Sequence, residues 1–359
     1  MKKNLLKILL AIFAVSLLSG CSGNKYKKYE YTFFDTFDTV TQIIGYTESQ
    51  EEFDSYMTQI HERSKDLHKL FDKYQNYEGL NNIKTINDNA GIKPVKVDRQ
   101  IIDLLLFSNE WYYKAGQVTN IAMGPVIKVW SDYRDKAIED PEKASLPARE
   151  ELEEAAKYTD IEKVIIDEKA STVFLQEKNM MLDLGSVAKG YSVELIAQEI
   201  EEAGLKSALI SGGGNIRSIG KPVEGNKERW GIGIQNPDPE LIDKGNVLET
   251  LFVNESSVVS SGDYQRYFMV DEKVYHHIID PNTLMPGDYY RAITIVTPDS
   301  GVADFLSTSA FLLPFEESLA LIESIDDTEA FWVMNDGSIR TSEGMNALML
   351  SEGASGGKK

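Results

Sequence analysis

The stretch GVADFLSTSAFLL, residues 301–313, is almost entirely apolar and predicts a helix packed into the core. It carries one carboxylate, Asp304, and the hydroxyl of Thr308 follows one helical turn later on the same face. A carboxylate on an apolar helix is either paired or bound to a cation. Two oxygen ligands at this spacing suit a hard ion such as Mg²⁺. The spacing leaves open that both are simply polar residues on an exposed helix face.

A second motif, DLGSVAKGY at residues 183–191, joins a predicted strand to a predicted helix. Helix N-termini present unpaired N–H groups and suit phosphate, and Gly185 and Ser186 allow a ligand close to the backbone. Lys189 lies within the first turn and can reach an anion or a flat ring. The alternative is that Asp183 only caps the helix and Lys189 is solvated.

The glycine run at residues 212–215, GGGN, is less informative. It does not match the dinucleotide-binding fingerprint, and the chain has no phosphate loop of the GK[ST] type. A tight turn between two strands explains the run as well as a ligand contact does.

Two of the four histidines, His276 and His277, stand side by side on a predicted strand at 274–279. Residues next to each other on a strand point to opposite faces, so we expect only one of them to enter a site. Neither a zinc pair nor a His/Cys cluster is indicated. Because His61 and His68 lie on a polar early helix, the sequence favours His276 or His277 as the base. The alternatives are that Asp304 accepts the proton, or that a metal makes a strong base unnecessary.

The composition excludes one class of function. The chain has 359 residues, 42% of them hydrophobic, which is ample for a packed core. Its formal net charge of −20 repels nucleic-acid backbones, so no nucleic-acid partner is expected.

The first 21 residues predict an export signal. Lys2, Lys3 and Lys7 precede an apolar run at 8–18 that is too short to span a bilayer, and LSGC follows at 18–21. This resembles a bacterial lipoprotein signal that is cleaved before Cys21, the only cysteine, and lipidated there, for example with palmitate. The alternative is a plain secretory signal with an incidental cysteine. We therefore expect the protein on the extracytoplasmic face of the cell membrane, held there by lipid.

Helical and strand patterns mix along the rest of the chain, which predicts an α+β fold rather than a doubly wound one. We expect a short linker at 22–30, a single domain at 31–350 and a disordered tail at 351–359. Within the domain, the pattern predicts a strand at 31–46, a loop at 76–89 and a surface excursion at 135–150.

As a set, these motifs resemble the ApbE family of FAD:protein FMN transferases, over about residues 31–350. The resemblance is carried by the motifs at 183–191 and 212–215, by SSGDYQRYF at 260–268, HHIIDP at 276–281 and ADFLST at 303–308. It implies a domain of mixed and antiparallel sheets with flanking helices, and FAD bound in a cleft.

The resemblance also implies an activity, which is the Mg²⁺-dependent transfer of FMN from FAD to a threonine or serine hydroxyl of a target protein, releasing AMP. The implied metal ligands are the Asp304 carboxylate, the Thr308 hydroxyl and the backbone oxygens of Ser186 and Ser307. The implied FAD contacts are Phe37, Tyr74, Val118, Thr119, Asn120, Asp183, Lys189 and the Ile278 backbone. The implied partners are redox proteins with FMN-binding domains, or flavinylated subunits of respiratory complexes.

The chain departs from the family pattern at three places. Phe37-Asp38-Thr39 stands where Met-Gly-Thr is usual, Asn120 where an aspartate is usual, and Leu284 where a glycine is usual. Two other functions stay open: an FAD pyrophosphatase that yields FMN and AMP, and a non-catalytic FAD-binding lipoprotein. Retention of Asp304 and Thr308 argues against mere storage, because tight FAD binding alone needs no metal carboxylate.

Overall fold

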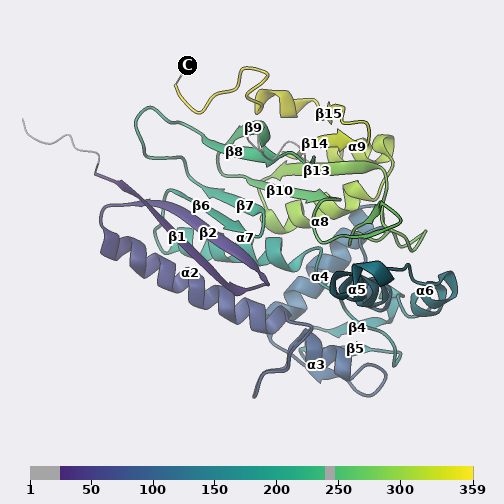
Figure 1. Cartoon of the computed structure of the whole chain (residues 1–359). Helices are drawn as coiled ribbons and strands as arrows, with labels where there is room; N and C mark the ends of the chain where they lie inside the picture. The colour runs from purple at the N-terminus through teal and green to yellow at the C-terminus, as the bar shows by residue number, and fades with distance from the viewer. Residues whose placement is uncertain (1–24, 239–246, 359) are drawn as a thin grey trace, which may run out of the picture.

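The computed structural model describes residues 25–238 and 247–358, and its centre is an eight-stranded antiparallel sheet (Figure 1). The strand order is β1-β2-β6-β7-β10-β13-β14-β15. These strands are β1 Lys27–Thr36, β2 Thr39–Thr47, β6 Ala208–Gly212, β7 Asn215–Ile219, β10 Ser257–Gly262, β13 Tyr290–Thr297, β14 Glu329–Met334 and β15 Ile339–Thr341.

One face of this sheet is covered by the helices α2 (Gln50–Phe71), α7 (Ala188–Glu202) and α8 (Ser300–Phe311). Helix α8 contacts both β10 and β13, and α7 lies between α8 and α2. Because α8 is packed on several sides, all but two of its residues are buried, as its apolar sequence predicts. Helix α9 (Phe315–Glu323) follows and packs against β14.

The opposite face is covered by the hairpin of β8 (Trp230–Gln235) and β9 (Val247–Val253) and by the C-terminal segment. Apolar side chains of the hairpin, among them Ile232 and Leu251, share a cluster with Met345 and Met349. This second core closes the outer side of β10, β13 and β14.

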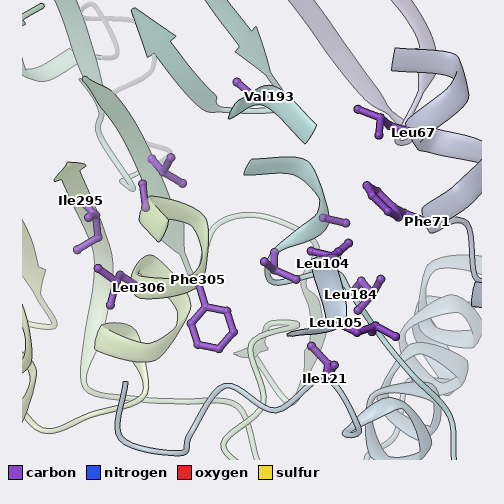
Figure 2. Packing of buried hydrophobic residues seen from close by; sticks show 14 of the residues in the cluster. Leu67, Phe71, Leu104, Leu105, Ile121, Leu184, Val193, Ile295, Phe305 and Leu306 are labelled. Carbon is purple, nitrogen blue, oxygen red and sulfur yellow. The ribbon is translucent and has the colours of Figure 1, made fainter. Parts of the chain in front are cut away.

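A lobe of helices and short strands lies beside the sheet (Figure 1). Its helices are α3 Ile83–Asp88, α4 Arg99–Lys114, α5 Gly124–Glu139 and α6 Arg149–Ala156, with 3₁₀ turns at Pro141–Lys143 and Ile161–Lys163. Its strands are β3 Val95–Lys96, β4 Val164–Asp167 and β5 Thr172–Leu175, and a separate hairpin joins β11 Phe268–Val270 to β12 Lys273–Tyr275. Figure 2 shows where lobe and sheet meet: Leu104, Leu105 and Ile121 lie near Leu184, with Phe305 and Leu306 of α8 close by.

The α+β fold with antiparallel sheets is confirmed, and four local predictions need correction. The strand expected at 31–46 is a hairpin that turns at Phe37–Asp38, and its first strand already begins at Lys27, within the expected linker. The expected loop at 76–89 contains α3, because Asn82 and Thr85 form a reciprocal capping box. The excursion at 135–150 does lie at the surface, with only Ala137 and Pro147 buried, but part of it is helical, because it continues α5 and leads into α6.

The fourth correction concerns the tail at 351–359, which was expected to be disordered. Its described residues, 351–358, are ordered. Ala354 is buried, and the Gly356 carbonyl accepts hydrogen bonds from the backbone N–H groups of Glu228 and Arg229. The small residues of this segment let it lie flat against the β8–β9 hairpin. Its Gly/Ser composition alone does not reveal this contact. None of the helices in the described residues is both long and apolar enough to cross a membrane.

Candidate active site

A cavity of about 400 Å³ opens where α7, α8, the tip of the β1–β2 hairpin and the lobe converge. Every residue expected to bind the ligand or the metal lines it, except Ser307. Cys21 lies outside the described residues. Ser307 is fully buried next to the cavity, where its hydroxyl bonds to that of Ser261 at 2.8 Å.

The carboxylate of Asp304 is held by the neighbouring helix. It is 5% exposed, and its Oδ2 accepts a hydrogen bond of 2.8 Å from the backbone N–H of Gly190 in α7. The ammonium group of Lys189 lies 4.0 Å from the same oxygen. Thr308 lies one turn further along α8 and also lines the cavity. The structure thus brings the predicted acid, hydroxyl and lysine together.

The donors present fit a magnesium ion. In the described part of the chain, no three His, Cys, Asp or Glu side chains gather into a metal-binding group. What the cavity offers is one buried carboxylate with a hydroxyl one turn away, and Ser186 on the facing loop. Hard oxygen ligands of this kind, with room for phosphate oxygens and water, are what Mg²⁺ requires.

Asp183 is not a simple helix cap. Its Oδ1 accepts the backbone N–H of Gly185 at 2.8 Å, and its Oδ2 forms an ion pair with Lys73. Burial opposes the charge on Lys73, but the Asp183 carboxylate outweighs it and raises the pKa of the lysine. The ammonium group lies 4.9 Å from the centre of the Tyr74 ring, which is largely exposed. A cation and an open aromatic face therefore stand together at the cavity wall.

The two adjacent histidines both line the cavity, so the expectation that they point to opposite faces is wrong. The strand alternation fails because β12 ends at Tyr275. His276 is fully engaged by backbone: its Nε2 donates to the Gly287 carbonyl at 2.7 Å, and its Nδ1 accepts the Ile278 N–H at 3.2 Å. This leaves it no free nitrogen for a ligand.

His277 is arranged differently. Its Nδ1 lies 3.2 Å from the Gln265 carbonyl, which can only accept, so Nδ1 carries the proton and Nε2 keeps a lone pair. No described residue bonds to Nε2. Burial, reinforced by the positive charges of Arg266 and Lys189, lowers the pKa of His277 to about 3. An imidazole that is neutral and has a free acceptor nitrogen can take a proton from a hydroxyl.

These pKa shifts predict a pH dependence of stability. Burial also lowers the pKa of His276, so both rings bind protons less readily in the folded protein than in the unfolded chain, whose histidines titrate near pH 6.5. The unfolded state then binds more protons, so stability should fall as the pH drops from about 6.5. We expect melting temperatures to decrease between pH 7 and pH 5, and to decrease less steeply in His277→Gln. Equal slopes for the two proteins would contradict the shift.

The far wall of the cavity is aromatic and was not predicted. Trp130 of α5 stacks on Tyr275 with ring centres 6.2 Å apart, and Phe268 packs against both. Asn120 also lines the cavity, and its side-chain amide bonds to the backbone: it donates to the Thr159 carbonyl and accepts from the N–H of Ala122, each at 2.8 Å. Where the family has aspartate, the amide therefore shapes the loop at residues 118–122 and leaves the backbone to face a ligand.

Several lining residues were missed because the sequence carries no signal for them. Lys73, Arg134 and His68 supply charge or hydrogen bonds, yet they lie outside any motif. His68 pins the hairpin tip, because its Nδ1 accepts the Phe37 N–H at 3.1 Å. A signal was available only for Arg266, which lies in the SSGDYQRYF motif.

Two of the three departures from the family pattern fall on left-handed backbone. Phe37 and Asp38 have φ of 53° and 50°, and Leu284 has φ of 61°. Glycine is the residue that adopts such angles without strain, which explains why the family places it at 38 and 284. Here the fold imposes the angles on larger side chains. Leu284 is buried, and its carbonyl accepts the Trp130 indole N–H. The glycine run at 212–215 is both a tight turn and part of the cavity wall: Gly213 and Gly214 have left-handed backbone, and Gly213 and Asn215 line the cavity.

A cavity that combines a buried carboxylate, neighbouring cations and aromatic walls in an α+β fold is suited to binding a nucleotide. The sequence pattern of the ApbE family matches residues 37–332, and the chain belongs to this family. It is 31% identical over 274 residues to an FAD:protein FMN transferase of Klebsiella pneumoniae, covering 74% of this chain and 81% of that one. It is 32% identical over 280 residues to the FAD:protein FMN transferase of Treponema pallidum, covering 73% of each.

Solved structures show the same fold. The crystal structure of the ApbE protein from Thermotoga maritima superposes with a TM-score of 0.77 at 26% identity, covering 90% of this chain and 99% of that one. The flavin transferase ApbE from Vibrio cholerae superposes with a TM-score of 0.74 at 20% identity, with the same coverage.

Proposed function

We propose that this protein is an FAD:protein FMN transferase that uses Mg²⁺ and a serine or threonine hydroxyl as acceptor. One observation carries the proposal: Asp304, Thr308, Lys189 and the free Nε2 of His277 share one cavity with an exposed tyrosine. Cleavage of the FAD pyrophosphate by a protein hydroxyl forms a phosphoester with FMN and releases AMP. The curated relatives bear the name of this activity.

Each residue has a role in that reaction. Asp304 and Thr308, with backbone oxygens of Ser186 and Ser307, would hold Mg²⁺. When bound, the ion neutralises phosphate charge. Lys189 and Arg266 add positive charge beside the phosphates, and His277 accepts the proton of the attacking hydroxyl through Nε2. Bound phosphates offset the two cations that depress the pKa of His277, so the ligand makes it a stronger base.

The aromatic residues have a binding role. The exposed ring of Tyr74 can stack on a flavin or adenine ring, and Phe37 lies at the hairpin tip on the same cavity. Asp183 and Lys73 lie beside Tyr74 and can bond to the polar edge of such a ring.

The decisive experiment mixes the purified protein with FAD, Mg²⁺ and a redox protein that carries an FMN-binding domain, and then measures the mass of the acceptor. The proposal requires a gain of one FMN less one water, together with release of AMP. Formation of free FMN and AMP with an unmodified acceptor would instead indicate a pyrophosphatase. Binding of FAD without either product would indicate a storage protein.

We further propose that Cys21 anchors the protein by lipid to the extracytoplasmic face of the cell membrane. Support comes from the LSGC junction after a short apolar run, and from Lys25, Lys27 and Lys28 close behind it. Partners reached from there would be flavinylated redox proteins or respiratory subunits outside the cytoplasm.

The anchor makes a prediction of its own. Cys21→Ser removes the only thiol that can carry the lipid, so this variant should stay unprocessed or appear in the soluble fraction. Cell fractionation and the apparent mass of the product check this. Normal processing together with normal membrane retention of the variant would rule the anchor out.

A further inference from the structure

A buried acid outside the cavity links the two helices that hold the metal site. Glu194 of α7 is 6% exposed, and its Oε2 accepts the backbone N–H of Ser300, the first residue of α8, at 2.8 Å. The same oxygen accepts from Nε of Arg217, which is 8% exposed, at 3.1 Å. Its Oε1 accepts from the Gln198 amide at 2.9 Å. The carboxylate is thus fully bonded and acts as a joint between α7, α8 and β7.

The joint lies one helical turn from the contact that orients Asp304. On α7, Gly190 and Glu194 share one face. Gly190 donates its N–H to Asp304, and Glu194 accepts the N–H at the start of α8. The helices are so close that a Cβ on Gly190 would lie less than 3.0 Å from both the Ser300 carbonyl and the Asp304 Cβ. Any slip of α8 along α7 would therefore move the Asp304 carboxylate.

The N-terminus of α8 already has its ordinary cap, which makes the second acid notable. Asp299 accepts the Val302 N–H at 2.9 Å, as an N-cap residue does. Burial, together with the nearby negative charge of Glu194, raises the pKa of Asp299. Asp299 alone already caps this helix end, so the second carboxylate, that of Glu194, adds repulsion between two negative charges. The positive charge of Arg217 offsets part of this repulsion.

We infer that Glu194 is a positioning residue for the metal site: it fixes the start of α8 against α7, so that Gly190 holds Asp304 in the orientation that binds the cation. The inference rests on the proposed function, because it assigns the residue a purpose in Mg²⁺ binding. Glu194 touches neither substrate nor cation, and its effect passes through Ser300, Gly190 and Asp304.

The test replaces the joint by apolar groups of similar volume. Exchanging a buried ion pair for well-packed apolar residues is often neutral for stability, so Glu194→Met combined with Arg217→Met should fold. The FAD-loaded protein is titrated with Mg²⁺, and the midpoint is read from the rise in melting temperature and, separately, from the transfer rate. We expect the Mg²⁺ midpoint to increase about tenfold, as for one lost charge-assisted hydrogen bond, with FAD affinity in the absence of Mg²⁺ within twofold of wild type.

Three further proteins sharpen the result. Glu194→Gln keeps an oxygen that can accept the Ser300 N–H, so its Mg²⁺ midpoint should stay within about threefold of wild type. Glu249→Met is the matched control, because Glu249 is also buried and accepts backbone N–H groups, from Leu350 and Ser351, but lies on β9, on the face of the sheet opposite α7 and α8. It should lower the melting temperature without changing the midpoint. Gly190→Ala tests the contact between the two helices itself: its methyl group must displace the Ser300 carbonyl and the Asp304 Cβ, so its Mg²⁺ midpoint should rise.

The outcomes are distinct. A double variant that melts at a lower temperature but keeps the wild-type Mg²⁺ midpoint, as the control does, would show that Glu194 is only structural. A Gln variant as impaired as the double variant would show that the hydrogen bond to Ser300 is not what matters. A wild-type protein that binds FAD but responds to Mg²⁺ in neither readout would overturn the metal part of the proposed function and this inference with it.

Discussion

Replacing Asp304 by alanine should abolish Mg²⁺-dependent transfer while the protein stays folded. Asp304 is the one carboxylate of α8, so under the proposed function its loss removes most of the protein charge that would hold the cation. Metal stabilisation of phosphate charge contributes several kcal/mol, so we expect the rate to fall about a thousandfold or more. Transfer to an acceptor protein, measured by mass over a range of Mg²⁺ concentrations, gives the answer.

Two companions make this measurement specific. Thr308→Ala removes the weaker hydroxyl ligand and should cost less, roughly tenfold in rate at limiting Mg²⁺. FAD binding in the absence of Mg²⁺ should survive in both variants, because Tyr74, Asp183 and the loop at 118–120 are untouched. If Asp304→Ala kept the Mg²⁺ response of the wild type, the metal would have to lie elsewhere.

The second large effect concerns the neighbouring histidines, which should behave differently. His277→Gln removes the free Nε2 in the cavity, and we expect the maximal transfer rate to fall about 10²-fold, as is usual for a positioned base. His276→Gln removes a ring whose two nitrogens bond to the backbone, so it should lower the melting temperature and leave the rate within a few-fold.

Measuring rate and melting temperature for both variants separates the two roles. The alternative is that Asp304 accepts the proton, or that the metal makes a strong base unnecessary. That alternative predicts a His277→Gln rate within about tenfold of wild type, and such a result would remove histidine from the chemistry.

Sequence reasoning selected residues that the fold brings into one cavity, because helical spacing and helix starts are local properties. Asp304 and Thr308 lie one turn apart in a segment whose apolar pattern could only be buried, and Lys189 follows a glycine-containing helix start. The position of His277 was predicted only as one of a pair. Its selection over His276 depends on the carbonyls of Gln265 and Gly287, which lie in segments the periodic pattern does not describe.

The remaining features of the fold and of the site could not be predicted, and the reason is physical. The pair of Lys73 with Asp183 and the contact of His68 with Phe37 join segments that only the tertiary fold brings together. The hairpin turn at Phe37–Asp38 contains an aspartate but no glycine, proline or asparagine, so the strand pattern ran through it unbroken. Helix α3 was missed because it is short and polar, and the order at 351–358 because it depends on the β8–β9 hairpin.

The strand order also dictates a sequence of events in time. Strand β2 pairs with β6, so Thr41 can form its pairing with Gly212 only after Gly212 has been synthesised. Likewise, α8 can pack on β10 and β13 only after the chain beyond residue 300 has emerged. A chain that emerges from its N-terminus therefore completes both the cavity and the central sheet late, the sheet last of all with β14 and β15. Such distant pairings make folding slow. A chain cut off before α8 would hold Lys189, Tyr74 and Asp183 but no Asp304, so the catalytic centre comes into being only with the last quarter of the protein.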